Sequence, residues 1–168
     1  MATTRLVLNV DSAQPVPGST LPQFKQAGSS VGVSSYSFDA GADEALQFVV
    51  PYVQAYGSGN LTVKLRWFAD TATSGDVVWG AAIAAITPET DSQDIETDSL
   101  ATENTVTDSH LGTTAQRLME ASITVSNLDS LAAADYLSLR IRRIGTNGSD
   151  TMSGDAQLAG VVVEYSDT

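Results

Sequence analysis

Two stretches of this sequence, residues 61–84 and 136–165, alternate apolar and polar side chains with a period of two residues. In residues 61–67, LTVKLRW, every second residue is apolar, and the residues between them are Thr, Lys and Arg. Residues 137–142, LSLRIR, repeat the pattern with Ser and Arg. A period of two places successive side chains on opposite faces of a strand, so both stretches predict half-buried strands. Charged outer faces favour an antiparallel sheet with one face in water.

Turn residues separate further apolar segments, and no segment keeps a helical period over three turns. Strands are expected over residues 5–10, 35–40, 45–53, 61–68, 77–86, 100–107, 116–126, 136–144 and 157–165. This spacing predicts an all-β protein with an antiparallel β-sandwich, a jelly roll of about eight strands. An immunoglobulin-like sandwich is the second interpretation, and it is weakened because the chain has no Cys…Trp…Cys pattern.

The segment 11–30 interrupts the strand pattern with three prolines and several Gly, Ser and Gln residues. Proline lacks the ladder donor and favours irregular backbone. The larger apolar residues of the segment follow neither a strand nor a helix period: Val16, Leu21 and Phe24. We expect residues 1–30 to form a weak first strand and an extended arm, loosely attached until it meets a neighbouring subunit, and residues 31–168 to form the sandwich domain. The alternative that residues 5–10 are an integral strand stays open.

The length of 168 residues predicts one domain with a core that needs no disulfide and no structural metal. The chain has no cysteine, which excludes thiolate zinc ligands and a thiol nucleophile. The first residues lack the charged region, apolar stretch and cleavage site of a signal peptide. We therefore expect synthesis in a cytoplasm.

The charge balance limits the classes of partner. Twenty acidic against eight basic residues give a formal net charge of −12, and such a charge repels phosphate backbones. We therefore expect no direct nucleic-acid partner and assign the charge either to solubility or to docking on a basic partner surface. No apolar run approaches the roughly 20 residues of a membrane-spanning helix, so no membrane partner is expected.

No set of residues in the sequence predicts catalysis. The single histidine, His110, lies in a polar loop and is expected at the surface, and there is no G-x-S-x-G nucleophile motif. So many carboxylates make some pair inevitable, which leaves glycoside hydrolysis without specific support. We expect no enzyme activity, no catalytic residue, no cofactor and no metal site.

Two acidic segments contain oxygen ligands of the kind that hard cations accept. The segment 89–108 has seven carboxylates and no Lys or Arg. It lacks the spacing of an EF-hand, so a solvated loop and a calcium site are its two interpretations. Asp150 and Asp155 flank a turn, and we expect a carboxylate there to pair with Arg142 or Arg143 rather than to bind a metal.

Most of the positive charge lies on two predicted strands, in Lys64, Arg66, Arg140, Arg142 and Arg143. Arginine suits bidentate recognition of carboxylates. The partners left open are carboxylates of the same chain, carboxylates of a neighbouring copy, and a ligand. Together with the three apolar arm residues, the candidate interface is Val16, Leu21, Phe24, Lys64, Arg66, Arg140 and Arg142.

Five aromatic residues are candidates for stacking on sugar rings: Tyr52, Tyr56, Trp67, Trp79 and Tyr136. Trp67 and Trp79 lie on apolar strand faces, so we expect both in the core. A carbohydrate-binding site would need solvent-exposed aromatics in a groove at the outer end of the sandwich.

Two motif-bearing segments, RWFADTATSGDVVWGAAIA (66–84) and YLSLRIRRIGTNGSDTMSGDAQLAGVVVEY (136–165), resemble small β-sandwich virion proteins of tailed bacteriophages. The resemblance covers residues 45–165 and leaves the proline-bearing arm unmatched. One departure is Ala134, where that pattern has glycine. The shared motifs are strand and turn residues, so the resemblance implies a fold and a virion setting and transfers no catalytic residue.

The resemblance implies a capsid decoration (cement) protein that stabilises the head as oligomers on the outer shell. Its expected partners are the major capsid protein and further copies of itself in a homotrimer, and its expected location is the virion. The alternative is a receptor- or carbohydrate-binding jelly-roll module of a phage tail or fibre.

Overall fold

The computed structural model describes residues 2–167 and is built from strands. In chain order the elements are β1 (Thr3–Leu8), the 3-10 turn η1 (Val10–Ser12), β2 (Gln14–Pro15), β3 (Gln23–Ala27), β4 (Val33–Phe38), β5 (Asp43–Val50), β6 (Tyr56–Ala69), β7 (Asp76–Ile86), β8 (Asn104–Ser109), β9 (Met119–Val125), β10 (Tyr136–Ile144) and β11 (Ala156–Asp167). Within the described residues no helix is long and apolar enough to cross a membrane.

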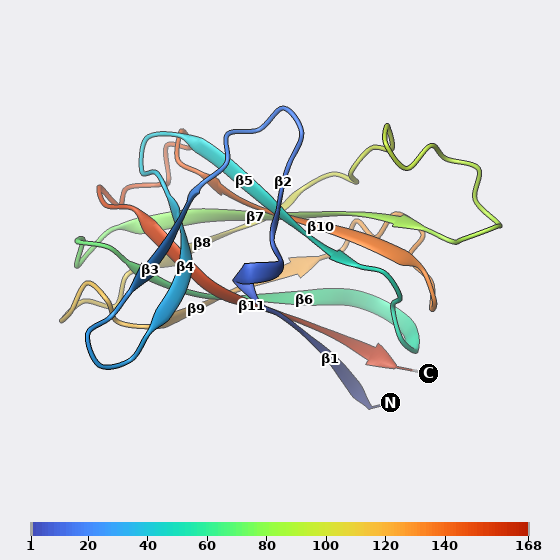
Figure 1. Ribbon diagram of the computed structural model, residues 1–168, viewed down its shortest axis with the longest axis horizontal. Coiled ribbons are helices and arrows are strands. Elements are labelled where there is room, and N and C mark those ends of the chain that lie inside the picture. The colour runs from blue at the N-terminus through green and yellow to red at the C-terminus, as the bar shows by residue number, and fades with distance from the viewer. Residues whose placement is uncertain (1, 168) are drawn as a thin grey trace.

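The strands form two antiparallel sheets that face each other (Figure 1). Five strands of the six-stranded sheet follow the order β3-β4-β11-β6-β9, and the sixth, β1, pairs with β11; the five-stranded sheet has the order β2-β5-β10-β7-β8. The long strand β11 pairs with β4 through its first residues and with β1 through its later ones. This arrangement confirms the all-β sandwich predicted from the alternation of side chains.

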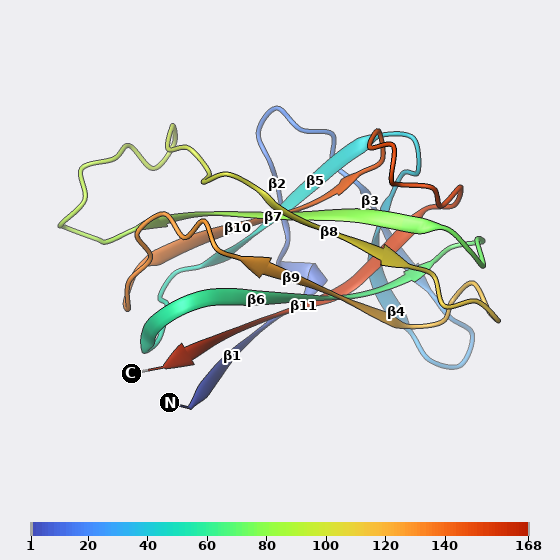
Figure 2. The same ribbon diagram turned by 180° about the vertical axis from the view of Figure 1, so that it is seen from behind.

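One lateral edge of the sandwich is held together by side-chain hydrogen bonds. Strands β8 and β9 belong to different sheets and lie side by side (Figure 2). The Asn104 side chain donates to the Ser126 hydroxyl and accepts the backbone N–H of Ser126 at 3.1 Å. Asn127 donates to the carbonyl of Thr102 at 2.8 Å. These bonds join the two sheets where no backbone ladder does.

The core lies between the sheets and follows the predicted alternation. On β6 the apolar positions are buried and the residues between them face water; β10 does the same with Leu137, Leu139 and Ile141. Trp67 and Trp79 are fully buried and meet edge to face, with ring centroids 6.1 Å apart. Their expected place in the core is confirmed.

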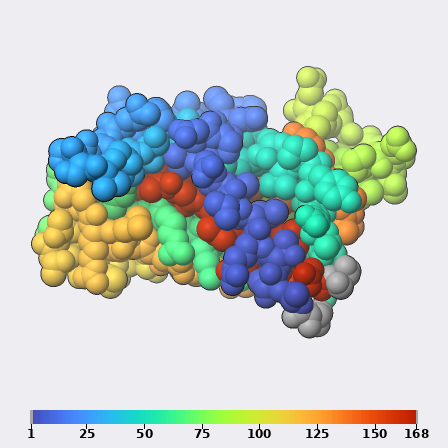
Figure 3. Space-filling view, turned by 60° about the horizontal axis from the view of Figure 1, so that its bottom comes forward, coloured from blue at the N-terminus to red at the C-terminus, as the bar shows by residue number. Residues whose placement is uncertain are grey.

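The N-terminal residues are paired with both sheets, which corrects the expectation of a loosely attached arm. Strand β1 runs antiparallel to β11 from Thr3 opposite Ser166 to Leu8 opposite Val161. Strand β2 then pairs with β5, and β3 pairs with β4. Figure 3 shows the first residues of the chain, in dark blue, beside the red atoms of β11. The alternative that residues 5–10 are an integral strand therefore holds for β1, which pairs with β11 over Val161–Ser166, beyond the residues of β11 that pair with β4.

A buried arginine joins β10 to two other parts of the fold. Arg143 is fully buried, and all five of its N–H donors have acceptors. Asp150 accepts from Nε at 3.0 Å and from Nη2 at 2.7 Å, while the carbonyls of Phe38, Met152 and Gly154 accept the other three bonds. The expected pairing of a carboxylate in this turn with Arg142 or Arg143 is confirmed, and the partner is Arg143.

Substitutions of two nearby valines test whether the N-terminal segment is anchored in the core. Val10 is 3% exposed and belongs to the core, whereas Val7 is 69% exposed. Val10→Asp should lower the free energy of unfolding by about 3 kcal/mol or more, because it buries an unpaired charge. Val7→Asp should cost less than about 1 kcal/mol. Urea unfolding measures both, and equal effects would show that the segment does not pack on the core.

Two neighbouring arginines test the buried network. Arg143→Lys keeps the charge but removes the planar fork, so several buried acceptors lose their donors, and we expect a loss of about 3–5 kcal/mol of unfolding free energy. The control, Arg142→Lys, changes a partly exposed side chain and should cost about 1 kcal/mol or less. Chemical denaturation followed by tryptophan fluorescence distinguishes the two. A buried network of no energetic value would give matching losses.

Candidate functional site

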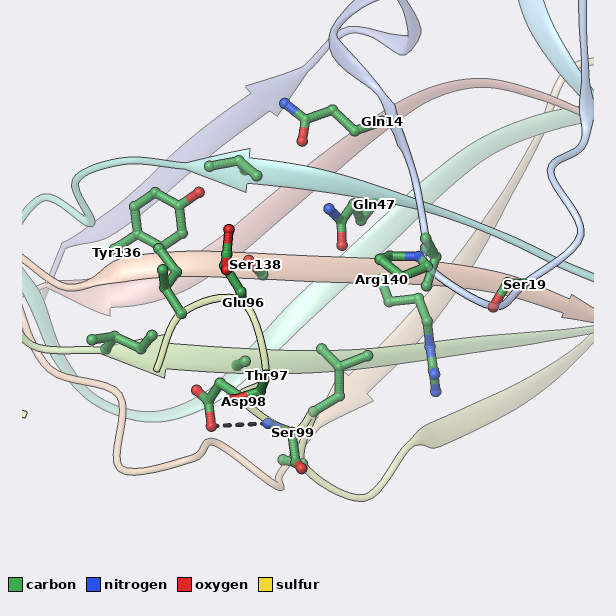
Figure 4. A pocket seen from close by; sticks show the side chains of 18 residues that line it. Gln14, Ser19, Gln47, Glu96, Thr97, Asp98, Ser99, Tyr136, Ser138 and Arg140 are labelled. Carbon is green, nitrogen blue, oxygen red and sulfur yellow. Dashed lines mark hydrogen bonds between the residues drawn. The ribbon is translucent and has the colours of Figure 1, made fainter. Parts of the chain in front are cut away.

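A groove of about 710 Å³ lies on the outer face of the five-stranded sheet (Figure 4). Its floor is formed by outward-facing residues of β5, β7 and β10, namely Gln47, Val49, Ala84, Ile86, Tyr136, Ser138 and Arg140. One wall is formed by residues 95–101 of the loop between β7 and β8, and the other by residues 14–19. The groove is the candidate site because polar side chains of β2, β5 and β10 come together in this hollow.

The floor follows directly from strand alternation. The inward residues of β10 are buried, so Tyr136, Ser138 and Arg140 must point outward. Cross-strand pairing places Ser138 between Val49 and Ala84. Three antiparallel strands thus bring side chains from distant parts of the chain onto one surface.

The first wall is an acidic loop whose carboxylates shape its own turns. The Asp91 side chain accepts the N–H of Thr87 at 2.7 Å, and the Asp94 side chain accepts the N–H of Glu96 at 2.9 Å. Such bonds are the usual work of Asp in loops. Within residues 2–167, no three His, Cys, Asp or Glu side chains gather closely enough to hold a metal ion.

Glu103 fastens this loop to the sheet. Its carboxylate accepts hydrogen bonds from Arg140 Nη2 at 2.8 Å and from Arg142 Nη2 at 2.7 Å. The side chain of Glu103 is 12% exposed. It lies directly over Gly80, where an added Cβ would stand 2.6 Å from the carboxyl carbon of Glu103. A residue without a side chain at position 80 therefore allows the carboxylate to lie flat on the strand.

The second wall is the proline-bearing segment. Its strand β2 sets Gln14 opposite Gln47 of β5. A turn follows, closed by the N–H of Ser19 donating to the carbonyl of Val16. The carbonyl of Thr20 then accepts the N–H of Ala45 at 3.0 Å. These bonds hold the segment beside the sheet, so the groove has two attached walls.

The groove can form many hydrogen bonds to a neutral polar molecule. Gln14 and Gln47 bring amides, Ser138 and Tyr136 bring hydroxyls, and Asp98 is one of the wall carboxylates. Tyr136 is the aromatic residue of the lining, and Figure 4 shows its ring at one end of the groove. The lining contains neither His nor Cys.

His110 lies outside the groove, and its expected surface position is wrong. It is 8% exposed. The imidazole accepts the N–H of Gly112 through Nδ1 at 3.0 Å, which leaves Nε2 to donate to the carbonyl of Ala115 at 3.0 Å. The ring closes its own loop and has no free nitrogen for chemistry.

The structure distributes the candidate interface residues over several surfaces. Val16 and Arg140 line the groove. Leu21 and Phe24 remain close to half exposed, and Phe24 packs edge to face on Tyr36 with ring centroids 5.3 Å apart. These residues are not gathered into one patch, and their role in an interface stays a prediction.

The cationic candidates bind carboxylates of their own chain. Lys64 bonds to Glu164 at 2.8 Å, and Arg66 pairs with Glu120. Hydrogen bonds from Arg5 and then from Lys64 lower the pKa of the Glu164 carboxyl. Arg142 pairs with Glu103 and, at 3.6 Å, with Asp43. Of the partners left open by the sequence, the same chain is the one the structure shows.

The sequence did not single out most of the groove lining. The sequence does not single out Gln14, Gln47 or Ser138; it offers Tyr136 as one of five aromatic candidates, and it offers Glu96 and Asp98 only as part of the acidic segment 89–108. The available signal is the outward register of β10, in which Tyr136 and Ser138 precede the outward arginines Arg140 and Arg142.

Comparisons with known proteins concern the fold. No protein-family model matches the chain, and no curated protein matches it. Similar solved structures include the C-terminal CBM6 of LamC, a marine laminarinase from Zobellia galactanivorans (13% identity, 95% of this chain and 98% of that chain, TM-score 0.47). Others are CBM35 from Cellvibrio japonicus Abf62 (10%, 98% and 99%, 0.49) and the non-crystalline cellulose-specific carbohydrate-binding module CBM28 (14%, 90% and 84%, 0.48).

What these three proteins bind is a property of those proteins. The β-sandwich fold of this chain rests on its own two antiparallel sheets, and the bacteriophage setting implied by the sequence motifs stays a prediction.

Gly80→Ala tests the attachment of the acidic wall. The new Cβ would displace the Glu103 carboxylate and break its bonds to Arg140 and Arg142. We expect proteolytic cleavage within residues 87–101 to become about three- to tenfold faster, because the loop opens more often. Limited proteolysis with mass spectrometry measures the rate. Gly160→Ala is the control, since its Cβ would meet nothing within 4 Å, and an equal acceleration there would contradict the assignment.

Proposed function

We propose that this chain is a carbohydrate-binding β-sandwich module that holds a neutral oligosaccharide in the groove between the acidic loop and the proline-bearing segment. The observation that carries the proposal is the lining of that groove. Amides, hydroxyls and an aromatic ring are gathered there on a rigid sheet, without a nucleophile and base pair that would indicate catalysis.

The chemistry of the lining suits a ligand rich in hydroxyl groups. A sugar hydroxyl both donates and accepts, so it needs side chains of both kinds around it. Gln14 and Gln47 offer donors and acceptors from the same amide, and Ser138 and Tyr136 offer hydroxyls that adapt to either role. The apolar wall residues Val16 and Ile95 can contact the C–H faces of a sugar ring.

Tyr136 is the residue proposed to stack on the ligand. An aromatic ring with an apolar body and a polar tip suits a site that is wet at one side. Its hydroxyl lies on the side of Gln14 in Figure 4, and its ring bounds one end of the floor. The sequence analysis required solvent-exposed aromatics in a groove at the outer end of the sandwich, and the groove on this sheet face holds one partly exposed aromatic residue, Tyr136.

The dimensions of the groove agree with this use. Ligand pockets commonly have volumes of about 300–1,000 Å³, and this groove has about 710 Å³. Both walls are attached to the sheet, by Glu103 on one side and by β2 on the other. A preformed groove loses little conformational freedom on binding, which favours affinity for a weakly interacting ligand.

Capsid decoration receives less support from the structure than carbohydrate binding. Its proposed contacts were the arm and the cationic strands, and these pair within the chain. Attachment to a major capsid protein, assembly as a homotrimer and location in the virion therefore stay predictions from the sequence motifs.

Paired tyrosine variants test the carbohydrate proposal. Tyr136→Ala should weaken binding of a neutral oligosaccharide about tenfold or more. A nucleic-acid base stacked on an aromatic side chain contributes about 1–3 kcal/mol, and we expect a similar value for a sugar ring stacked on Tyr136. Tyr52→Ala removes a 63% exposed tyrosine outside the groove lining and should leave affinity unchanged. A glycan array finds the ligand and calorimetry measures both variants. An array without hits among neutral glycans, or equal losses for the two variants, would refute the proposal.

A further inference from the structure

The groove contains a single cationic residue among its lining, Arg140. An arginine in a ligand groove normally invites an anionic group, because its planar fork matches a carboxylate or a sulfate. Whether this arginine can do so depends on what already occupies its guanidinium.

Glu103 pairs with the charge of Arg140 through Nη2, while the Nε of Arg140 is buried without a hydrogen-bond partner. Nη2 of Arg140 bonds to Oε1 of Glu103 at 2.8 Å, and the second oxygen of the same carboxylate takes two bonds from Arg142, at 2.7 and 3.2 Å. Arg142 also lies 3.6 Å from Asp43. Two guanidinium groups thus share two carboxylates, and the cluster carries no surplus positive charge.

The environment makes this neutralisation strong. The Glu103 side chain is 12% exposed and that of Arg140 is 22% exposed, so water screens their attraction less than at an open surface. Gly80 gives the carboxylate room to lie against the strand beneath both arginines. An anionic ligand would have to displace a carboxylate that is already covalently part of the wall.

The remaining charge around the groove is negative. The wall residues Glu96 and Asp98 form no ion pair with any described residue. Oδ2 of Asp98 is buried without a hydrogen-bond partner. The whole chain adds a formal net charge of −12. A uronate or a sulfated sugar would enter this field at a cost, whereas a neutral sugar would not.

We propose that the groove discriminates against anionic glycans and accepts neutral ones, and that Glu103 sets this preference by pairing with the positive charge of Arg140. The inference rests on the proposed function and specifies its ligand class. Glu103 acts through Arg140 and is a positioning residue, so its replacement should alter charge preference rather than simply abolish binding.

The test compares neutral polysaccharides with their own sulfated derivatives. The probes are β-glucan, xylan, mannan and galactan, each beside its sulfated form, measured by affinity electrophoresis and calorimetry at low ionic strength and at 0.3 M salt. For a neutral glycan that binds, we expect the sulfated form to have a Kd about tenfold higher or more at low salt. The difference between the two Kd values should become smaller at 0.3 M salt, because salt screens the repulsion between the sulfate groups and the acidic residues around the groove.

Two isosteric variants assign the preference to Glu103. Glu103→Gln should lower the ratio of the sulfated to the neutral Kd by about three- to tenfold, because it leaves Arg140 unneutralised. Glu120→Gln makes the same change in net charge and frees Arg66 on the other sheet, so the ratio should stay within about twofold of wild type. If Glu103→Gln does not fold, Asp98→Asn, which leaves the arginine cluster intact, should lower the ratio in the same direction.

The outcomes separate the inference from the function on which it rests. Equal affinity of the wild-type protein for neutral and sulfated forms would overturn the inference and leave carbohydrate binding in place. An equal decrease in the ratio of the sulfated to the neutral Kd in the Glu120→Gln variant would also overturn the inference, because the decrease would then be due to the change in net charge. Absence of binding to every probe and to a neutral glycan array would overturn the proposed function itself.

Discussion

The buried arginine of β10 is the contact on which the arrangement of the five-stranded sheet depends. Arg143 occupies an inward position of a strand whose other inward residues are Leu and Ile. Burying a guanidinium is costly unless every donor is used and the charge is paired. Asp150 and three backbone carbonyls meet that condition. The long turn after β10 and the end of β4 are therefore held in place together, which fixes the strand that forms the centre of the groove floor.

Neighbouring residues of this strand serve opposite purposes because the side chains alternate. Arg143 faces inward and organises the core, while Arg142 and Arg140 face outward and meet Glu103. The bonds between Arg143 and Asp150 hold the strand β10 in place. The bonds from Arg140 and Arg142 to Glu103 hold the acidic loop against the outer face of the same strand. The groove thus depends on one strand with arginines on both faces. Asp150 pairs with the inward arginine, and Glu103 pairs with the two outward ones.

The sequence predicted what depends on local pattern. Alternation over residues 61–67 and 137–142 gave the faces of β6 and β10 correctly, and it placed Trp67 in the core. It could not predict the pairing of β2 and β3, because their partners are free edges of β5 and β4. It also predicted His110 at the surface, because the neighbouring residues in the sequence are polar. In the folded chain the imidazole ring is buried. The sequence did not predict the groove, because its floor and walls come from segments that are far apart in the chain.

The two ends of the described chain lie on adjacent antiparallel strands and leave the sandwich at the same point (Figure 1). Thr3 stands opposite Ser166, and the pairing continues rung by rung to Leu8 opposite Val161. Tension applied between the ends would load these hydrogen bonds one after another rather than all at once. The strand β1 would therefore unzip at low force, and the next resistance would come when Val10 is drawn out of the core. Under tension, the molecule therefore yields first at β1, in the sheet that does not carry the groove.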